Sequence, residues 1–405
     1  MTDLEGLFEE LKDELLELFH RGVEEPLSDE MFNDLALRVF RFQCRTNGAY
    51  AAFSARRTPD PEKIDRWEEI PHLPTRAFKS VALVAGDATR YEAVFRTSGT
   101  TRGKEARGRH VVRSLDLYRA SLLPNFRAHL LPDEDQLLLL ALLPDPAQAP
   151  DSSLSFMMGE VKDRLCGGRG GFFADPDSGV RGDAFHQALR EIEGIGEPVL
   201  LAGTAFAFVH WLEIAAKEGW GGCLPEGSRI METGGFKGRS RAMSREELYC
   251  GLEESLGIPT NRIVNEYGMT EMLSQFYEPV GGLQGMDSRG GARREGTGRG
   301  RSALGGWGGS PEDLSGRYHR GPPWVRTRAL HPLTLEPLPV GEVGILAHLD
   351  LANLGSVSAV LTEDLGCLVP GGFRLQGRSS GAEPRGCSLA MEEFLAGVEG
   401  GRDVL

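Results

Sequence analysis

The sequence contains no apolar run of membrane-spanning length and no excess of basic residues. Its 405 residues include 59 acidic and 45 basic side chains, for a net charge of -14. This balance argues against general nucleic-acid binding and against a basic membrane-surface role. The aliphatic stretch Leu137 to Leu143 is short enough to suit a buried strand. We therefore expect no nucleic-acid partner and no membrane span.

Paired cysteines and an export signal are also missing. The six cysteines are scattered without a C-x-x-C pair, which argues against a zinc site and against a disulfide framework. The first 22 residues are acidic and carry apolar residues at helical spacing. They lack the basic and apolar regions of a signal peptide, so the cytoplasm is the expected compartment.

The pattern along the chain predicts an α/β protein. Residues 1–90 are expected to form the N-terminal helical part of a large domain, and residues 91–377 its core. In that core strands alternate with helices, which predicts a largely parallel sheet with ligands at the carboxyl ends of the strands. Residues 281–323 are crowded with Gly and Arg, and we expect a mobile insertion there. Residues 378–405 are expected to form a short C-terminal tail.

A segment rich in glycine, hydroxyl groups and cations, "FRTSGTTRGKEARGRH", runs from Phe95 to His110. It predicts either a polar surface turn or a loop that wraps nucleotide phosphates. In the second case the glycines let the backbone approach the phosphates closely, and hydroxyls, amides and cations contact the phosphate oxygens. His110 is expected to be a turn residue without a catalytic role.

Four further motifs provide what a nucleotide site needs. Two of them, "ETGGFKGR" and "EYGMTE", each follow a predicted strand. A nucleotide base could lie against the backbone of the first motif and stack on the aromatic ring of the second. A hydroxyl and a carboxylate in the second motif could reach phosphate and magnesium. "TEDLG" is expected to present Asp364 after a strand, where it could accept hydrogen bonds from ribose. "GFRLQGR" brings Arg378 fourteen residues later.

These motifs, in this order, resemble those of the adenylate-forming superfamily of acyl-CoA synthetases and related ligases. Within that superfamily the chain resembles the LuxE-type acyl-protein synthetases, and the phenylacetate–CoA ligases are the next nearest branch. The likeness extends from about residue 40 to the end, and six stretches carry it: "IPHLPTRAFKS", "FRTSGTT", "METGGFKGR", "NEYGMTEM", "LANLGSVSAVLTEDLG" and "RGCSL". It implies the large domain of an adenylate-forming enzyme: parallel-rich sheets layered with helices, a small distorted barrel-like part and a much reduced C-terminal cap.

The resemblance also implies ATP and Mg²⁺ as cofactors and a long-chain fatty acid as substrate, with a LuxC-like reductase subunit as a possible partner. Lys104, Thr270, Glu271 and Cys387 would be catalytic, and Glu271 would also bind the magnesium. The remaining implied residues would bind ATP: Thr97, Ser98, Gly99, Thr100, Thr101, Gly234, Gly235, Phe236, Tyr267, Gly268, Asp364 and Arg378.

The sequence departs from the superfamily pattern in two places. Lys104 lies one position earlier than the usual lysine of the phosphate loop, so Arg102 or Arg107 could substitute for it. Full acyl-CoA synthetases carry a C-terminal domain with a lysine that assists adenylation, whereas Lys237 is the last lysine here. The second departure favours the LuxE type over a CoA ligase.

Cys387 matches the cysteine that accepts the acyl group in the LuxE type. It precedes a helical pattern, and a helix N-terminus beside Arg385 would stabilise a thiolate. The alternative is a buried cysteine that packs the tail, which we also expect of Cys367. Three functions therefore remain open: acyl transfer to Cys387, an acid–CoA ligase, and a non-catalytic nucleotide- or acyl-binding protein. The segment with Phe206, Phe208, His210 and Trp211, like Met157 and Met158, could line an acyl tunnel or form core.

Overall fold

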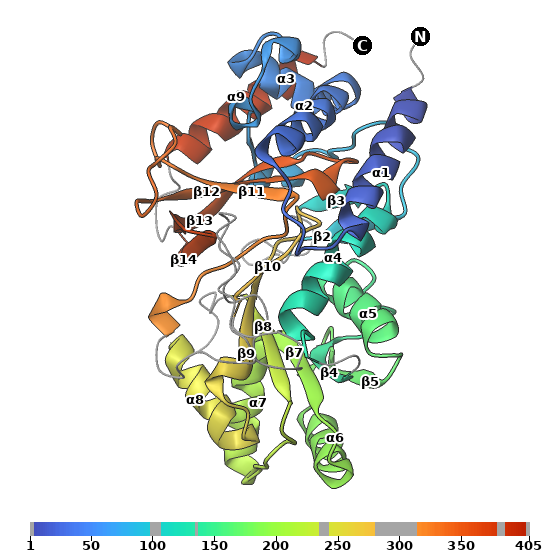
Figure 1. Ribbon diagram of the computed structural model, residues 1–405, viewed down its shortest axis with the longest axis vertical. Helices are drawn as coiled ribbons and strands as arrows, with labels where there is room; N and C mark the ends of the chain where they lie inside the picture. The colour runs from blue at the N-terminus through green and yellow to red at the C-terminus, as the bar shows by residue number, and fades with distance from the viewer. Residues whose placement is uncertain are drawn as a thin grey trace, which may run out of the picture.

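A computed structural model gives the fold shown in Figure 1. The structure describes residues 4–97, 107–133, 137–234, 243–279, 314–378 and 385–401. Among these residues, no helix is long and apolar enough to cross a membrane.

The N-terminal part begins with three helices. These are α1 (Leu4–His20), α2 (Asp29–Thr46) and α3 (Gly48–Arg57). The apolar stripe of α1 is buried at Phe8, Leu11 and Leu15, which confirms its expected amphipathic character. Three short 3₁₀ turns follow, η1 (Pro61–Lys63), η2 (Trp67–Glu69) and η3 (Thr75–Lys79), together with the short strand β1 (Leu73–Pro74).

The largest sheet of the described residues has the strand order β10-β9-β8-β7-β4-β5-β6. Its central strands are parallel, and only the pairs β5–β6 and β9–β10 are antiparallel. The strands are β4 (Leu138–Pro144), β5 (Gly170–Asp175), β6 (Gly179–Val180), β7 (Val199–Thr204), β8 (Arg229–Thr233), β9 (Ile263–Tyr267) and β10 (Phe276–Tyr277). The predicted strand–helix alternation and parallel sheet are therefore confirmed.

Helices cover both faces of this sheet (Figure 1). They are α4 (Leu115–Leu130), α5 (Ser153–Leu165), α6 (Gly182–Ile195), α7 (Ala205–Glu218) and α8 (Arg245–Leu256). Side chains of β4 alternate between two cores: Leu139 and Ala141 join the core with α4 and α5, whereas Leu140 and Leu142 join the core with α6, α7 and α8. Because β4 is buried on both faces, its sequence is an almost continuous run of aliphatic residues. Helix α8 begins at the capping box of Ser244 and Glu247 and is followed by Gly257, as predicted.

A second sheet is packed above the first in Figure 1 and has the order β1-β13-β12-β11, with β14 paired to β13. Its longer strands are β11 (Val325–Leu330), β12 (Val343–Asp350), β13 (Ala359–Val369) and β14 (Gly372–Arg378). The strands β2 (Ala93–Arg96) and β3 (Arg109–Val112) form a separate hairpin. Much of the predicted insertion lies outside the described residues. Its last ten residues are described, and there Arg320 pairs with Tyr277 and His319 with Phe373.

The C-terminal helix α9 (Arg385–Gly401) returns to the N-terminal helices and lies beside α3 in Figure 1. Phe394 is fully buried there, and its ring meets that of Phe53 edge-on at 6.4 Å. Arg57 Nε donates to Glu393 Oε2 at 2.8 Å at the rim of this contact. Helix α9 is therefore held in place by α3, which lies more than 300 residues earlier in the sequence.

We expect Phe394→Ala to detach α9 before the rest of the protein unfolds. Truncating a buried phenylalanine typically costs about 3–5 kcal/mol, and α9 has this side chain as its main apolar anchor to α3. Hydrogen exchange of α9 should become faster in the variant, while the amides of β4 and β7 keep their protection. Leu389→Ala is the matched control, since Leu389 lies on the same helix but is 43% exposed. Equal exchange in the two variants would contradict the anchoring role.

Candidate active site

Two predicted ligand-binding motifs lie together where β8 and β9 end. These strands are parallel neighbours, and Thr233 is in register with Glu266. Gly234 follows β8 with a φ of 78°, which favours glycine over other residues. Gly268 follows β9, and a Cβ atom there would lie 2.3 Å from Glu266 Oε1. The backbone conformation of Gly234 therefore favours glycine independently of any ligand, whereas a Cβ at Gly268 would meet the carboxylate end of the Glu266 side chain. Gly235 and Phe236 lie outside the described residues.

A hydrogen-bonded trio joins three of the predicted residues. The Tyr267 hydroxyl donates to Asp364 Oδ2 at 2.8 Å, and Arg378 Nε donates to Asp364 Oδ1 at 2.7 Å. The register of β13 and β14 places Asp364 opposite Arg378. The expectation that Asp364 follows a strand was wrong: it lies inside β13, which continues to Val369 because β12 and β14 pair with it on both sides.

The ring of Tyr267 is surrounded by other aromatic side chains. Its neighbours within 6 Å between centroids are Phe276, His319, His348 and Phe373. Tyr267 is only 7% exposed, so this conformation offers a base little ring surface. Stacking of adenine on Tyr267 stays a prediction.

The predicted phosphate loop is closed at its base by hydrogen bonds between its two strands. Thr97 N donates to Gly108 O at 3.0 Å, and Gly108 N donates to Thr97 Oγ1 at 2.8 Å. Arg107 donates to the Thr97 carbonyl at 2.7 Å and forms an ion pair with Asp151 at 3.0 Å. The Arg107 guanidinium thus contacts the base of the loop through three of its nitrogens, and its substitution for the usual lysine stays a prediction. The other predicted loop residues, Ser98, Gly99, Thr100, Thr101, Arg102 and Lys104, lie outside the described residues.

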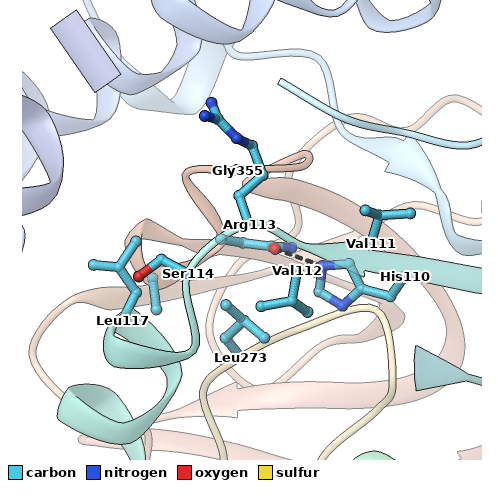
Figure 2. A pocket seen from close by; sticks show the side chains of 10 residues that line it. His110, Val111, Val112, Arg113, Ser114, Leu117, Leu273 and Gly355 are labelled. Carbon is cyan, nitrogen blue, oxygen red and sulfur yellow. Dashed lines mark hydrogen bonds between the residues drawn. The ribbon is translucent and has the colours of Figure 1, made fainter. Parts of the chain in front are cut away.

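His110 and Asn353 hold the backbone of Thr270 and Glu271. His110 Nδ1 lies 2.6 Å from the Thr270 carbonyl, and Nε2 lies 2.8 Å from Asn353 Oδ1. Asn353 Nδ2 donates to the Glu271 carbonyl at 2.8 Å. Figure 2 shows His110 in the pocket that it lines with Leu273, and its dashed line marks the contact with Asn353.

The expectation that His110 is a turn residue was wrong. It lies in β3, pairs with Phe95 and is 1% exposed. Burial lowers the pKa of His110 to about 4, although the contacts with Thr270 and Asn353 oppose this effect. Spacing within the motif could not reveal the role of His110, because its partners lie 160 and 243 residues away.

Asp350 holds the next residues of the same loop. Its carboxylate accepts from Leu273 N at 3.0 Å, from Ser274 N at 2.9 Å and from the Ser274 hydroxyl at 2.7 Å. The side chain is fully buried, and burial raises the pKa of Asp350 against the effect of these bonds. Gln43 of α2 in turn donates to the carbonyls of Asn353 and Leu354. The loop after β9 is thus held by side chains of two distant segments, β3 and residues 350–353, and Gln43 supports the second of these.

Thr270 and Glu271 are half-buried, and the contacts described above involve their backbone carbonyls. Among the described residues, no three His, Cys, Asp or Glu side chains lie close enough to hold a metal ion by themselves. Proteins commonly hold Mg²⁺ through one or two carboxylates together with phosphate oxygens. A single carboxylate such as that of Glu271 fits this mode.

Cys387 lies in the first turn of α9, as predicted, but its thiol is enclosed. The residue is 2% exposed, and Sγ donates to the Thr362 carbonyl at 3.5 Å. Thr362 precedes Asp364 by two residues on β13. The thiol therefore already contacts the strand that carries the predicted ribose-binding carboxylate. Cys367 is buried in the same strand.

Two buried acids lie beside the predicted adenine loop. Glu232 accepts from the Tyr249 hydroxyl at 3.0 Å, and Glu266 accepts from the Thr233 hydroxyl. Burial raises the pKa of each to about 7, and the charge of Glu232 adds to the rise at Glu266. Each acid therefore changes its protonation near neutral pH.

The residues suggested for an acyl tunnel are divided by the structure. Phe208 and Trp211 belong to the core between α6, α7 and the sheet, whereas Phe206 is 47% exposed. Met157 and Met158 are buried in the other core. Core packing accounts for Phe208, Trp211 and both methionines.

Comparison with known proteins agrees with the resemblance found in the sequence. A family model described as "Acyl-protein synthetase, LuxE" matches residues 14–279. The chain belongs to the LuxE family of acyl-protein synthetases. It is 23% identical over 387 residues to a long-chain-fatty-acid–luciferin-component ligase of Vibrio harveyi, covering 92% of this chain and 90% of that protein. An Aliivibrio fischeri protein of the same name is 32% identical over 93 residues, covering 21% of this chain and 24% of its own length.

The structural comparison shows the fold. An open conformation of 2-hydroxyisobutyryl-CoA ligase, in complex with 2-HIB-AMP and CoA, superposes with a TM-score of 0.56 at 14% identity. The match covers 88% of this LuxE-family chain and 76% of that ligase. The predicted fold of an adenylate-forming ligase is therefore confirmed.

We expect His110→Phe to reduce the rate of acid-dependent ATP–pyrophosphate exchange by more than tenfold. Phenylalanine keeps the edge-on ring contact with Phe78 but removes the single N–H that a neutral His110 can donate to the Thr270 carbonyl or to the Asn353 amide oxygen. Each buried polar group left unpaired costs about 1–3 kcal/mol. The loss should fall on kcat more than on KM for ATP, because Thr270 would be misplaced during the reaction.

His129→Phe is the matched control, since His129 is also buried and burial lowers its pKa to about 4 as well. Its ring contacts Asn125 within α4, so the variant should lose stability but keep its exchange rate. If both variants lose activity in proportion to stability, His110 has no positioning role.

We expect Glu232→Gln to remove part of the pH dependence of stability. The pKa of Glu232 is higher in the folded state, about 7, than its ordinary value of 4.5. The folded state therefore binds more protons between these values, and stability falls as pH rises from about 5 to 7. Glutamine cannot ionise, so the unfolding free energy of the variant relative to wild type should rise between pH 5 and pH 8 by roughly 2–3 kcal/mol. Urea unfolding measures this difference, and Glu246→Gln, at an exposed position in α8, should show none.

Proposed function

We propose that this protein activates a long-chain fatty acid with ATP and transfers the acyl group to its own Cys387, for delivery to an acyl reductase subunit. Membership of the LuxE family supports acid activation, and the names of the Vibrio harveyi and Aliivibrio fischeri relatives support the fatty acid. The observation that carries the proposal is the contact of the Cys387 thiol with β13, two residues from Asp364.

In the first step, a carboxylate oxygen of the acid attacks the α-phosphorus of ATP, and pyrophosphate leaves. Asp364 would accept hydrogen bonds from the ribose hydroxyls, with Arg378 holding its carboxylate in place. Thr270 would bind the α-phosphate, and Lys104 and the hydroxyls of the loop at residues 97–101 would bind the outer phosphates. Glu271 would help to hold Mg²⁺, which would neutralise charge between the two anions.

In the second step, the Cys387 thiol gives its proton to solvent, and its sulfur attacks the acyl carbonyl carbon of the adenylate. A thioester forms, the bond to the phosphate oxygen breaks, and AMP leaves. A thiol that is 2% exposed cannot meet the adenylate without movement. We therefore expect the first turn of α9 to leave β13 before this step.

The burial of Cys387 favours a second candidate, an acid–CoA ligase in which CoA accepts the acyl group and Cys387 packs the tail. In that case the adenylate forms in the same way, but the thiol of a diffusing CoA takes the place of the cysteine. The two candidates differ in where the acyl group ends.

Intact-protein mass spectrometry after incubation with ATP, Mg²⁺ and tetradecanoic acid distinguishes them. We expect wild type to gain one acyl group that hydroxylamine removes, and Cys387→Ser to gain none. Cys367→Ser, at a buried cysteine of β13, is the matched control and should be acylated like wild type. Pyrophosphate release without an adduct, together with acyl-CoA formation on addition of CoA, would instead establish the ligase.

A further inference from the structure

The turn η3 lies in the motif "IPHLPTRAFKS", to which the steps described above give no role. Two contacts fix its position. Phe78 is 1% exposed, and its ring meets that of His110 in β3 edge-on at 5.6 Å. Arg76 forms an ion pair with Glu363 of β13. The turn is therefore held against both β3 and β13.

Lys79 follows Phe78 directly, and its side chain passes the base of the predicted phosphate loop. A Cβ atom at Gly108 would lie 3.2 Å from Lys79 Cγ and 3.1 Å from Thr97 Cγ2. Glycine at position 108 thus leaves the room that the Lys79 stem occupies. The stem and Thr97 border the same point, where hydrogen bonds between Thr97 and Gly108 close the loop. Lys79 is exposed, so beyond this contact the side chain is accessible to a ligand.

The positive charge of Lys79 is not balanced by an acid in the part of the chain that the structure describes. The other lysines described there each form an ion pair with an acid close in sequence: Lys12, Lys63, Lys162 and Lys217. Lys79 forms none with the described residues. Asp151, the acid at the base of the loop, already pairs with Arg107 at 3.0 Å and with Arg96 at 3.9 Å. The ammonium group of Lys79 is therefore available to a bound anion.

We propose that Lys79 is a phosphate-binding residue, whose ammonium group contacts an outer phosphate oxygen of ATP beside Thr97. Negative charge builds on the pyrophosphate as it leaves, and a cation held in place stabilises that charge. Lysine binds phosphate as a point charge with three N–H donors, so the contact needs no bidentate geometry. The inference rests on the proposed function, because it takes ATP as the bound anion.

Isothermal titration calorimetry of the full chain with ATP and with AMP, each with Mg²⁺ and without a fatty acid, tests the proposal. We expect Lys79→Gln to weaken ATP binding about fivefold or more, through loss of a charged hydrogen bond. AMP binding should not change, because AMP lacks the outer phosphates. Lys79→Arg keeps the charge and should recover most of the affinity for ATP. Lys63→Gln, which removes an exposed lysine of η1, is the matched control and should bind both nucleotides like wild type.

Acetylation of lysines by an N-hydroxysuccinimide ester, followed by peptide mass spectrometry, tests the same contact in wild type. ATP with Mg²⁺ should slow the labelling of Lys79 severalfold, whereas AMP should not. Lys63 should be labelled equally with either nucleotide and without one.

Unchanged ATP binding in Lys79→Gln, or labelling of Lys79 that ATP does not slow, would overturn the inference and leave the proposed function standing. An equal loss of ATP and AMP binding would also overturn it, because it would show a general disturbance of the site. Absence of ATP binding to wild type would overturn the proposed function together with this inference.

Discussion

The candidate active site depends on the hydrogen bonding of one irregular loop, residues 268–274, which follows β9. Buried backbone groups outside helices and sheets need partners, and here buried side chains provide them. His110 meets the Thr270 carbonyl, Asn353 meets that of Glu271, and Asp350 accepts from two N–H groups further along. Thr270 and Glu271 can therefore be held at fixed positions although they lie in no regular element.

The second sheet brings the other half of the site to this loop. Asp364 on β13 receives hydrogen bonds from Tyr267 and from Arg378, so one carboxylate joins both sheets. The same strand accepts a hydrogen bond from Cys387 at Thr362. Strand β13 thus connects the predicted nucleotide site with the predicted acyl acceptor. The Cys387 thiol stays buried against this strand while α9 is docked on α3.

The sequence was sufficient to predict features that depend on near neighbours. The aliphatic run of β4, the capping box at Ser244 and the glycines after β8 and β9 follow from local spacing, and the structure confirms them. It was insufficient where a role depends on distant partners. His110 bonds to residues 160 and 243 positions away, and Asp364 lies inside a strand because β14 extends the pairing. Neither relation leaves a periodic signal in the sequence.

The burial of Cys387 limits how the proposed acyl transfer could proceed. Opening of a terminal element such as α9 commonly costs a few kcal/mol. Every further 1.4 kcal/mol or so would lower the fraction of molecules with an open α9 and an accessible thiol about tenfold. The contacts that hold α9, chiefly Phe394 and the Arg57–Glu393 pair, would then set the rate of thioester formation as much as the chemistry does. A bound adenylate can accelerate this step only if it favours the open helix over the docked one. Strand β13 carries both Asp364 and the Thr362 carbonyl that accepts from the thiol. A ligand that binds to Asp364 therefore acts on the same strand that holds the thiol in the docked helix.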